Sequence, residues 1–227
     1  MFYIVMSLAF ASMLLLSIFR RKIYSVSSIF LCVVLTIIVA ILGYSSTKVM
    51  YFIENNAWLG QSFYGAVLFF PIVLFPLSLL FRIKLNKLLD YETISGLSVL
   101  IWYKLNCYIS GCCGGKVLYY KAGGVPAYFP SQIVEMIVAI LIILSLLLFE
   151  KKGLFKNCLY PLFLIMYGTT RFILNYYRWE TDEFVLGLTA GAFWSIVSVI
   201  IGVVWISLYY LYKYLQARKH RPKERDM

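Results

Sequence analysis

Residues 93–105 read TISGLSVLIWYKL, and this segment decides whether the chain crosses a membrane six or seven times. A helix needs about 20 predominantly apolar residues to cross the hydrocarbon core of a bilayer. Serine, glycine and Lys104 dilute the apolar character of this segment, so its hydropathy alone leaves the question open. The distribution of charge along the rest of the chain answers it.

The Lys and Arg residues fall into seven groups, at 20–22, 48, 82–87, 104–121, 151–156, 171–178 and 213–225. If 93–105 crosses the membrane, the first, third, fifth and last groups share one side, which then holds fifteen of the 21 basic residues. The cytoplasmic side of a membrane protein carries the excess of Lys and Arg. With six crossings this bias largely disappears. We therefore predict seven transmembrane helices, with the N-terminus outside and the C-terminus in the cytoplasm.

The composition is typical of a polytopic integral membrane protein of the all-α class. Of the 227 residues, 62% are apolar and 14% are charged, and the mean hydropathy is +0.84. These values exclude a disordered chain, a disulfide scaffold and an ordinary soluble enzyme. The basic residues that give a net charge of +11 lie mostly between apolar runs, so no nucleic-acid partner is expected. The other six predicted spans are 3–19, 23–43, 61–81, 133–149, 158–174 and 184–211.

We expect a single transmembrane domain over residues 1–227, because no internal repeat or long linker divides the chain. The first span is expected to be retained, since its basic cluster follows the apolar run and a signal peptide carries its basic residues before it. The loops predicted outside are 47–60, 106–132 and 175–183. Residues 212–227 are predicted to form a basic cytoplasmic tail.

Four charged residues lie in or beside the predicted spans: Lys104, Glu135, Arg171 and Arg178. A charge at membrane depth is costly unless it faces a cavity or a partner, so each marks a candidate site. A guanidinium forms paired, charge-assisted hydrogen bonds with phosphate or carboxylate, and in the outer half of a bilayer the abundant anion is a phospholipid head group. Two alternatives remain: Arg171 pairs with Glu135 as a structural contact, or the arginines extend to the membrane surface.

The two arginines belong to a longer polar stripe. Tyr167 and Arg171 are four residues apart and therefore share a helix face, with Asn175 one turn further and Arg178 just beyond. The stripe offers a phenol, an amide and two guanidiniums to one ligand.

Residues 107–116 read CYISGCCGGK, and this segment forms the second candidate cluster. Its cysteine spacing does not match the C-x2-C pattern of zinc sites and no histidine is near, so neither a metal nor another cofactor is predicted. Gly111 and Gly115 suit close backbone approach or an anion-binding turn, and a simple chain reversal is the alternative. We expect the three cysteines to be structural, so that serine at all three positions leaves membrane insertion and activity intact.

Four segments together resemble the prolipoprotein diacylglyceryl transferases, and most closely the short form of that family, which carries a C-F-x-x-G-C-C-x-G segment. They are SFYG at 62–65, CYISGCCGG at 107–115, PSQIVE at 130–135 and YGTTRF at 167–172, which leads to Arg178. The resemblance covers residues 60–195, the transferase-like core. Residues 1–59 would then be variable N-terminal spans.

The resemblance implies an enzyme of the cell (cytoplasmic) membrane that moves the diacylglyceryl group of phosphatidylglycerol to the lipobox cysteine of preprolipoproteins. Its partners would be phosphatidylglycerol, the preprolipoprotein signal peptide and membrane lipids. The arginines would hold the phosphate, Tyr167 would orient the head group, and Tyr64 would serve where the longer form has histidine. By position, the catalytic residues would be Tyr64, Lys104 and Arg171, and the substrate-binding residues Tyr167, Arg178, Glu135, Gln132, Gly111 and Asn175.

This chain also differs from the family pattern. Lys104 replaces an arginine, Asn175 replaces a glutamate and Val134 replaces a tyrosine. The alternative function is therefore a catalytically weakened accessory protein of the same fold, which binds lipid or protein partners. A transporter or channel is disfavoured, because the sequence has no internal repeat and its intramembrane charges gather toward one side.

Overall fold

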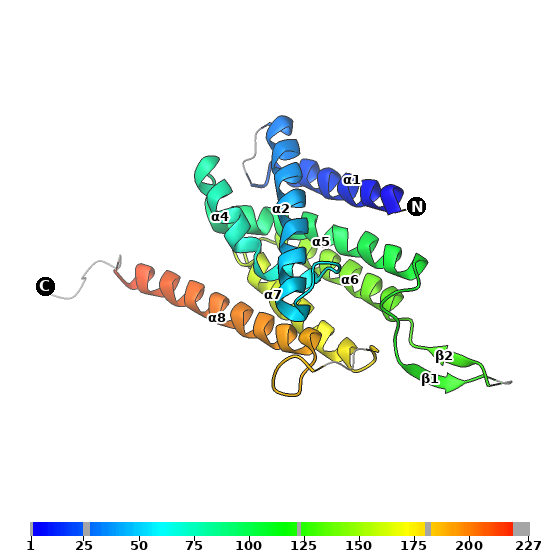
Figure 1. The fold of residues 1–227 in the computed structure, drawn as a ribbon. Coiled ribbons are helices and arrows are strands. Elements are labelled where there is room, and N and C mark those ends of the chain that lie inside the picture. The colour runs from blue at the N-terminus through cyan, green and yellow to red at the C-terminus, as the bar shows by residue number, and fades with distance from the viewer. Residues whose placement is uncertain (1, 25–27, 122–123, 180–182, 220–227) are drawn as a thin grey trace, which may run out of the picture.

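Helix α5, Leu85–Ile109, contains the segment whose hydropathy is ambiguous, and it lies in the middle of the fold (Figure 1). In this computed structural model, which describes residues 2–24, 28–121, 124–179 and 183–219, α5 packs against α1, α4, α6 and α7. Thirteen of its 25 residues are buried. The hydroxyls of Thr93 and Ser98 donate to carbonyl oxygens of the preceding turn, so they bring no unsatisfied polar group into the interior. Because protein covers α5, it can be less apolar than a lipid-facing helix.

The described residues form seven further helices. They are α1 (Phe2–Arg20), α2 (Ile29–Asn55), α3 (Phe63–Leu68), α4 (Phe70–Leu80), α6 (Ser131–Lys151), α7 (Leu159–Asn175) and α8 (Ala190–Lys219). Within the described residues, five segments are long and apolar enough to cross a membrane: α1, α2, α3 together with α4, α6 and α8. The chain is therefore a mostly helical, multi-pass membrane protein. The more polar α5 and the shorter α7 are also helical, whereas seven crossings and their orientation stay predictions.

The predicted boundaries of α2 are wrong. The sequence predicts a span over 23–43 and an outside loop over 47–60, whereas α2 runs from Ile29 to Asn55. The hydroxyls of Ser45, Ser46 and Thr47 donate to carbonyl oxygens three or four residues earlier. These polar residues therefore satisfy their own hydrogen bonds inside the helix and do not end it.

The predicted span 61–81 is divided into α3 and α4 at Phe69, with Pro71 in the first turn of α4. Short α3 lies directly against α2. A Cβ added at Gly65 would stand 2.0 Å from the carbonyl oxygen of Ser46, so only glycine permits this approach. The contact fixes the position of Tyr64, the neighbouring residue.

A small β-hairpin follows α5, inside the segment predicted as the loop 106–132. Strands β1 (Val117–Tyr120) and β2 (Pro126–Tyr128) pair antiparallel and extend away from the helices (Figure 1). Helix α8 begins at Ala190 and not at 184, because Val185 and Leu188 pair across a turn with Gly187 at φ +72°. Of the predicted tail 212–227, the part to Lys219 continues α8, and the rest lies outside the described residues.

A buried polar cluster ties together the helix ends opposite the candidate site. The guanidinium Nε of Arg20, at the end of α1, donates to Glu150 Oε2 over 2.9 Å near the end of α6. Asp90, near the start of α5, accepts from the backbone N–H of Leu159, at the start of α7, over 2.9 Å. The charge distribution predicts the basic group 20–22 on the cytoplasmic side, and within this group Arg20 is only 4% exposed. It therefore joins helices in the interior.

Candidate functional site

Glu135 is the centre of the candidate site, because three cations contact its carboxylate. Lys104 Nζ lies 2.7 Å from Oε2, and the NH1 atoms of Arg171 and Arg178 lie 2.6 and 2.8 Å from Oε1. The site thus joins the last turns of α5 and α7 to the first turns of α6. The pairing of Arg171 with Glu135, which the sequence left as an alternative, is present.

All four charged side chains of this cluster are buried, with exposures of 4–8%. Ion pairs and hydrogen bonds must compensate such burial, since an isolated buried charge is very costly. Two guanidiniums share one carboxylate oxygen, and each guanidinium carries five N–H donors. The planar guanidinium fork matches phosphate as well as carboxylate, so the chemistry of this cluster also suits a phosphate.

Arg178 lies beyond the end of α7 and is positioned by its backbone. It forms an isolated antiparallel bridge with Gly115, and the Lys116 N–H donates to the carbonyl of Tyr177 over 2.8 Å. A Cβ at Gly115 would stand 2.4 Å from the carbonyl oxygen of Phe129. The predicted close backbone approach is thus confirmed for Gly115.

Gly111 has a different local role. Its φ of +69° lies in the left-handed region, and a Cβ placed there would meet no described atom within 4 Å beyond its two chain neighbours. The residue therefore lets the chain turn at the end of α5, a conformation that glycine adopts without strain.

Tyr64 and Tyr167 form an aromatic group beside the charged cluster. Their ring centroids lie 5.8 Å apart, and the Tyr64 hydroxyl shares a 2.6 Å hydrogen bond with Ser195 Oγ of α8. Tyr167 stacks on Phe163 at 5.6 Å, one turn earlier on α7. Tyr167 and Arg171 are both buried on α7, in keeping with the predicted shared face.

Gln132 and Asn175 make contacts outside the charged cluster. The Gln132 Nε2 donates to the carbonyl of Cys112 over 2.5 Å, which ties the start of α6 to the cysteine turn. The Asn175 Nδ2 donates to Thr189 Oγ1 over 2.7 Å, at the entrance of α8. These two hydrogen bonds therefore join segments of the chain.

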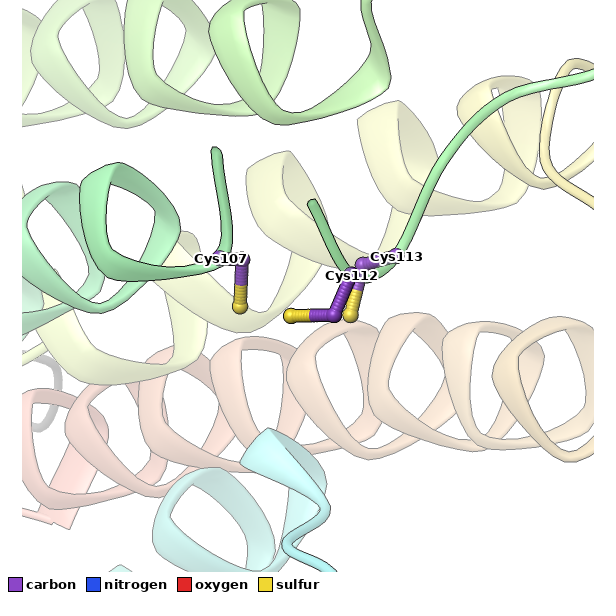
Figure 2. A group of neighbouring side chains, drawn as sticks. All are labelled: Cys107, Cys112 and Cys113. Atoms are coloured by element: carbon purple, nitrogen blue, oxygen red, sulfur yellow. The ribbon is translucent and has the colours of Figure 1, made fainter. Parts of the chain in front are cut away.

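The three cysteines after α5 converge in space, which their spacing does not indicate. The Sγ atoms of Cys107, Cys112 and Cys113 all lie within 4.8 Å of one another. Figure 2 shows Cys107 leaving the end of α5 and the other two leaving the following turn. The hydrogen bond with Cys107 lowers the pKa of the Cys113 thiol to about 5, although partial burial acts in the opposite direction, and the charge of Lys104 contributes to the lowering.

An apolar cavity of about 450 Å³ adjoins the site. Residues of α1, α2, α3, α4, α5 and α7 line it, and three of them neighbour site residues: Phe63, Tyr103 and Phe163. Phe63 precedes Tyr64 in the chain, Tyr103 precedes Lys104, and Phe163 stacks on Tyr167. The arrangement places a cavity suited to hydrocarbon beside a cluster suited to an anion.

Some residues at the site were not predicted from the sequence. Ser195 is separated from its partner Tyr64 by more than a hundred residues, and no local pattern indicates the contact. Ser131 donates to the carbonyl of Cys113 over 2.7 Å, and its place in the 130–135 segment was the available signal.

Comparisons with known proteins agree on one family. The sequence model of the prolipoprotein diacylglyceryl transferases matches residues 1–208. A phosphatidylglycerol–prolipoprotein diacylglyceryl transferase of Clostridium tetani is 26% identical over 203 residues, which cover 81% of this chain and 82% of that relative. A protein of the same name from Idiomarina loihiensis is 27% identical over 174 residues, which cover 68% of this chain and 64% of that relative.

Proposed function

Because this chain belongs to the prolipoprotein diacylglyceryl transferase family, we propose that it moves the diacylglyceryl group of phosphatidylglycerol to the cysteine thiol of preprolipoproteins. In this reaction the thiol sulfur attacks a glyceryl carbon, and glycerol phosphate leaves. The protein needs to hold a lipid, bind a phosphate that gains charge as it leaves, and admit a thiol. The first two requirements correspond to features near Glu135.

The convergence of three cations on one carboxylate is the observation that carries this proposal. As the bond between carbon and phosphate oxygen breaks, negative charge develops on the phosphate, and fixed cations lower the energy of that state. Arg171 and Arg178 are suited to bind phosphate in a bidentate manner, and Lys104 adds a point charge. Glu135 holds the three cations at one position before the substrate arrives.

The apolar cavity supports a lipid substrate. Its volume of about 450 Å³ is within the usual range for small-molecule sites, roughly 300–1,000 Å³. Burial of acyl chains there would place the glycerol backbone beside Tyr64 and Tyr167, whose hydroxyls then orient the head group. Gln132, Gly111 and Asn175 act as positioning residues in this proposal, since their contacts or conformations shape the surrounding segments.

We further propose that the protein works in the cell membrane with seven spans, its N-terminus outside and its C-terminus in the cytoplasm. Under this topology the Glu135 cluster lies toward the outer face. There it meets both the outer-leaflet lipid and a preprolipoprotein that has crossed the membrane.

Arg171→Lys tests the proposal. The variant keeps a positive charge but loses the planar fork, so we expect near-normal expression and thermal stability with transfer reduced at least tenfold. The assay measures the mass increase of a lipobox peptide incubated with phosphatidylglycerol and the purified protein. Lys121→Gln, which changes an exposed cation at the hairpin, is the matched control and should transfer at the parental rate.

The outcomes separate the two candidate functions. Transfer by Arg171→Lys at the parental rate would refute the phosphate-binding role. Parental protein that binds phosphatidylglycerol but transfers nothing to the peptide would favour the accessory protein.

A further inference from the structure

The three-cysteine turn has the geometry of a metal site. Three thiolates bound to one zinc ion at about 2.3 Å in tetrahedral geometry lie about 3.8 Å from one another. The Sγ atoms of Cys107, Cys112 and Cys113 already lie within 4.8 Å of one another. Their separations therefore need to shorten by about 1 Å at most.

The backbone of the turn is held in place from several directions. The N–H of Cys112 donates to the carbonyl of Cys107 over 3.0 Å, which fixes the first two ligands relative to each other. Gln132 and Ser131, at the start of α6, donate to the carbonyls of Cys112 and Cys113 over 2.5 and 2.7 Å. The thiols are thus presented by an organised turn, so little ordering remains for a metal to impose.

The number and charge of the ligands indicate the kind of metal site. Sulfur ligands favour Zn²⁺ or soft monovalent ions over hard cations. Among the described residues no fourth ligand joins the group, and zinc sites with three protein ligands keep one position for substrate. Three thiolates and one Zn²⁺ carry a net charge of −1, which Lys104, one turn before Cys107 on α5, is placed to compensate.

The cysteine turn is also adjacent to the Glu135 cluster. Gln132, which contacts the turn, lies one helical turn, about 5 Å of rise, before Glu135 on α6. Gly115, two residues after Cys113, pairs with the backbone of Arg178. A thiol bound at the turn would therefore lie next to the phosphate-binding cations.

We propose that Cys107, Cys112 and Cys113 bind one Zn²⁺, whose open fourth position takes the acceptor cysteine thiol of the preprolipoprotein. This inference rests on the proposed function and explains how the acceptor thiol is activated. On binding zinc the acceptor thiol gives its proton to water and becomes a thiolate. Its sulfur then forms the bond to the glyceryl carbon, and the carbon–oxygen bond to phosphate breaks. The electron pair of that bond leaves with the phosphate oxygen beside Arg171 and Arg178.

The sequence predicts the opposite, a structural role without metal, because C-x4-C-C is not a recognised zinc spacing. The difference arises from the turn. Gly111 and Cys113 both have positive φ, at +69° and +59°, so the chain folds back over the end of α5 and brings the later thiols to the earlier one.

A metal titration of the full chain tests the site. The protein is purified in detergent, stripped of metal and titrated with Co²⁺, whose thiolate absorption reports sulfur ligation. We expect one equivalent to bind and Zn²⁺ to displace it. Cys112→Ser, at an exposed position, should weaken Co²⁺ binding more than about tenfold. Loss of a residue that only contacts a metal ligand already weakens metal binding by about that factor. Cys158→Ser removes a buried thiol outside the turn and should bind Co²⁺ normally. Equal Co²⁺ binding by the two variants, at equal thermal stability, would refute the proposed metal site.

A second measurement tests the open position. A lipobox peptide should change the visible Co²⁺ spectrum, and the same peptide with serine in place of cysteine should not. An unchanged spectrum would overturn the thiol-binding role.

Transfer assays separate this inference from the proposed function. Arg171→Lys should bind Co²⁺ normally but transfer lipid at least tenfold more slowly than the parent. If metal-free protein and Cys112→Ser transfer lipid at the parental rate, the zinc-site proposal is wrong and the transferase proposal stands. If zinc-loaded parental protein binds the peptide thiol but transfers nothing, the transferase proposal is wrong and the zinc site stands.

Discussion

Replacing Glu135 by glutamine tests whether its carboxylate holds the three cations together. Glutamine keeps the size of the side chain but presents one oxygen and one NH2 group. We expect the oxygen to stay with Arg171 and Arg178, which both contact Oε1. The NH2 group then faces Lys104, which contacts Oε2, so that two donors oppose each other without an acceptor.

The expected loss is large. Breaking a buried ion pair by removing one partner costs about 3–5 kcal/mol. For a chain of this size each kcal/mol lowers Tm by about 2–4 °C, so Glu135→Gln should lower Tm by about 6–20 °C. Lys104→Met leaves both arginines paired and should cost about 1.5–3 kcal/mol, the value of one charge-assisted hydrogen bond. In the double variant no ammonium faces the amide, so the combined loss should be smaller than the sum of the two by about 0.5–3 kcal/mol.

Thermal unfolding in detergent of the parent, both single variants and the double variant provides the measurement. Glu183→Gln makes the same chemical change at an exposed carboxylate and should alter stability by less than about 0.5 kcal/mol. The reasoning is refuted if Glu135→Gln is as stable as this control, or if the losses of the two single variants simply add.

Three further predictions concern the site, the topology and the packing. Lys104→Arg should keep or raise the rate of lipid transfer, because the guanidinium fork adds a second donor. Lys104→Ala should lower the rate about tenfold or more. Equal rates of both variants and the parent in a peptide-transfer assay would contradict a role for this charge. A reporter fused after Lys156 should be cytoplasmic and one fused at Lys121 external, and reporters on the same side would exclude α5 as a span. Gly115→Ala places a Cβ 2.4 Å from a carbonyl oxygen and should lower the free energy of unfolding by about 1–3 kcal/mol, measured by thermal unfolding. The control Gly114→Ala places its Cβ in open space, and equal effects of the two changes would contradict this packing.

Hydropathy predicts helices well where an apolar run has clear ends. The predicted spans 3–19, 133–149 and 158–174 agree with α1, α6 and α7 to within two residues at each end. The end of α2 was missed because hydroxyl side chains look like loop residues in sequence but bond within the helix. The break at Phe69 was missed because an apolar run does not show where a helix is interrupted.

The residues of the candidate site could be selected from the sequence, but their mutual contacts could not. A charge inside an apolar run is conspicuous, so Glu135 and Arg171 were identified. That Lys104, Arg171 and Arg178 all contact one carboxylate depends on how α5, α6 and α7 pack, which no local pattern specifies. The ion pair of Arg20 could not be predicted for the same reason, since its partner Glu150 lies 130 residues away.

The two buried polar clusters lie closer together along the helices than the two surfaces of a typical bilayer core. On α6 they are marked by Glu135 and Glu150, fifteen residues apart and therefore separated by about 22 Å along the helix. The hydrocarbon core of a typical bilayer is about 30 Å thick. A membrane that surrounds these helices must become thinner, or the clusters must lie below the level of the neighbouring head groups. Under the proposed function, the phosphate of the lipid substrate then reaches Glu135 by lying several ångströms deeper than the phosphates of an unperturbed bilayer.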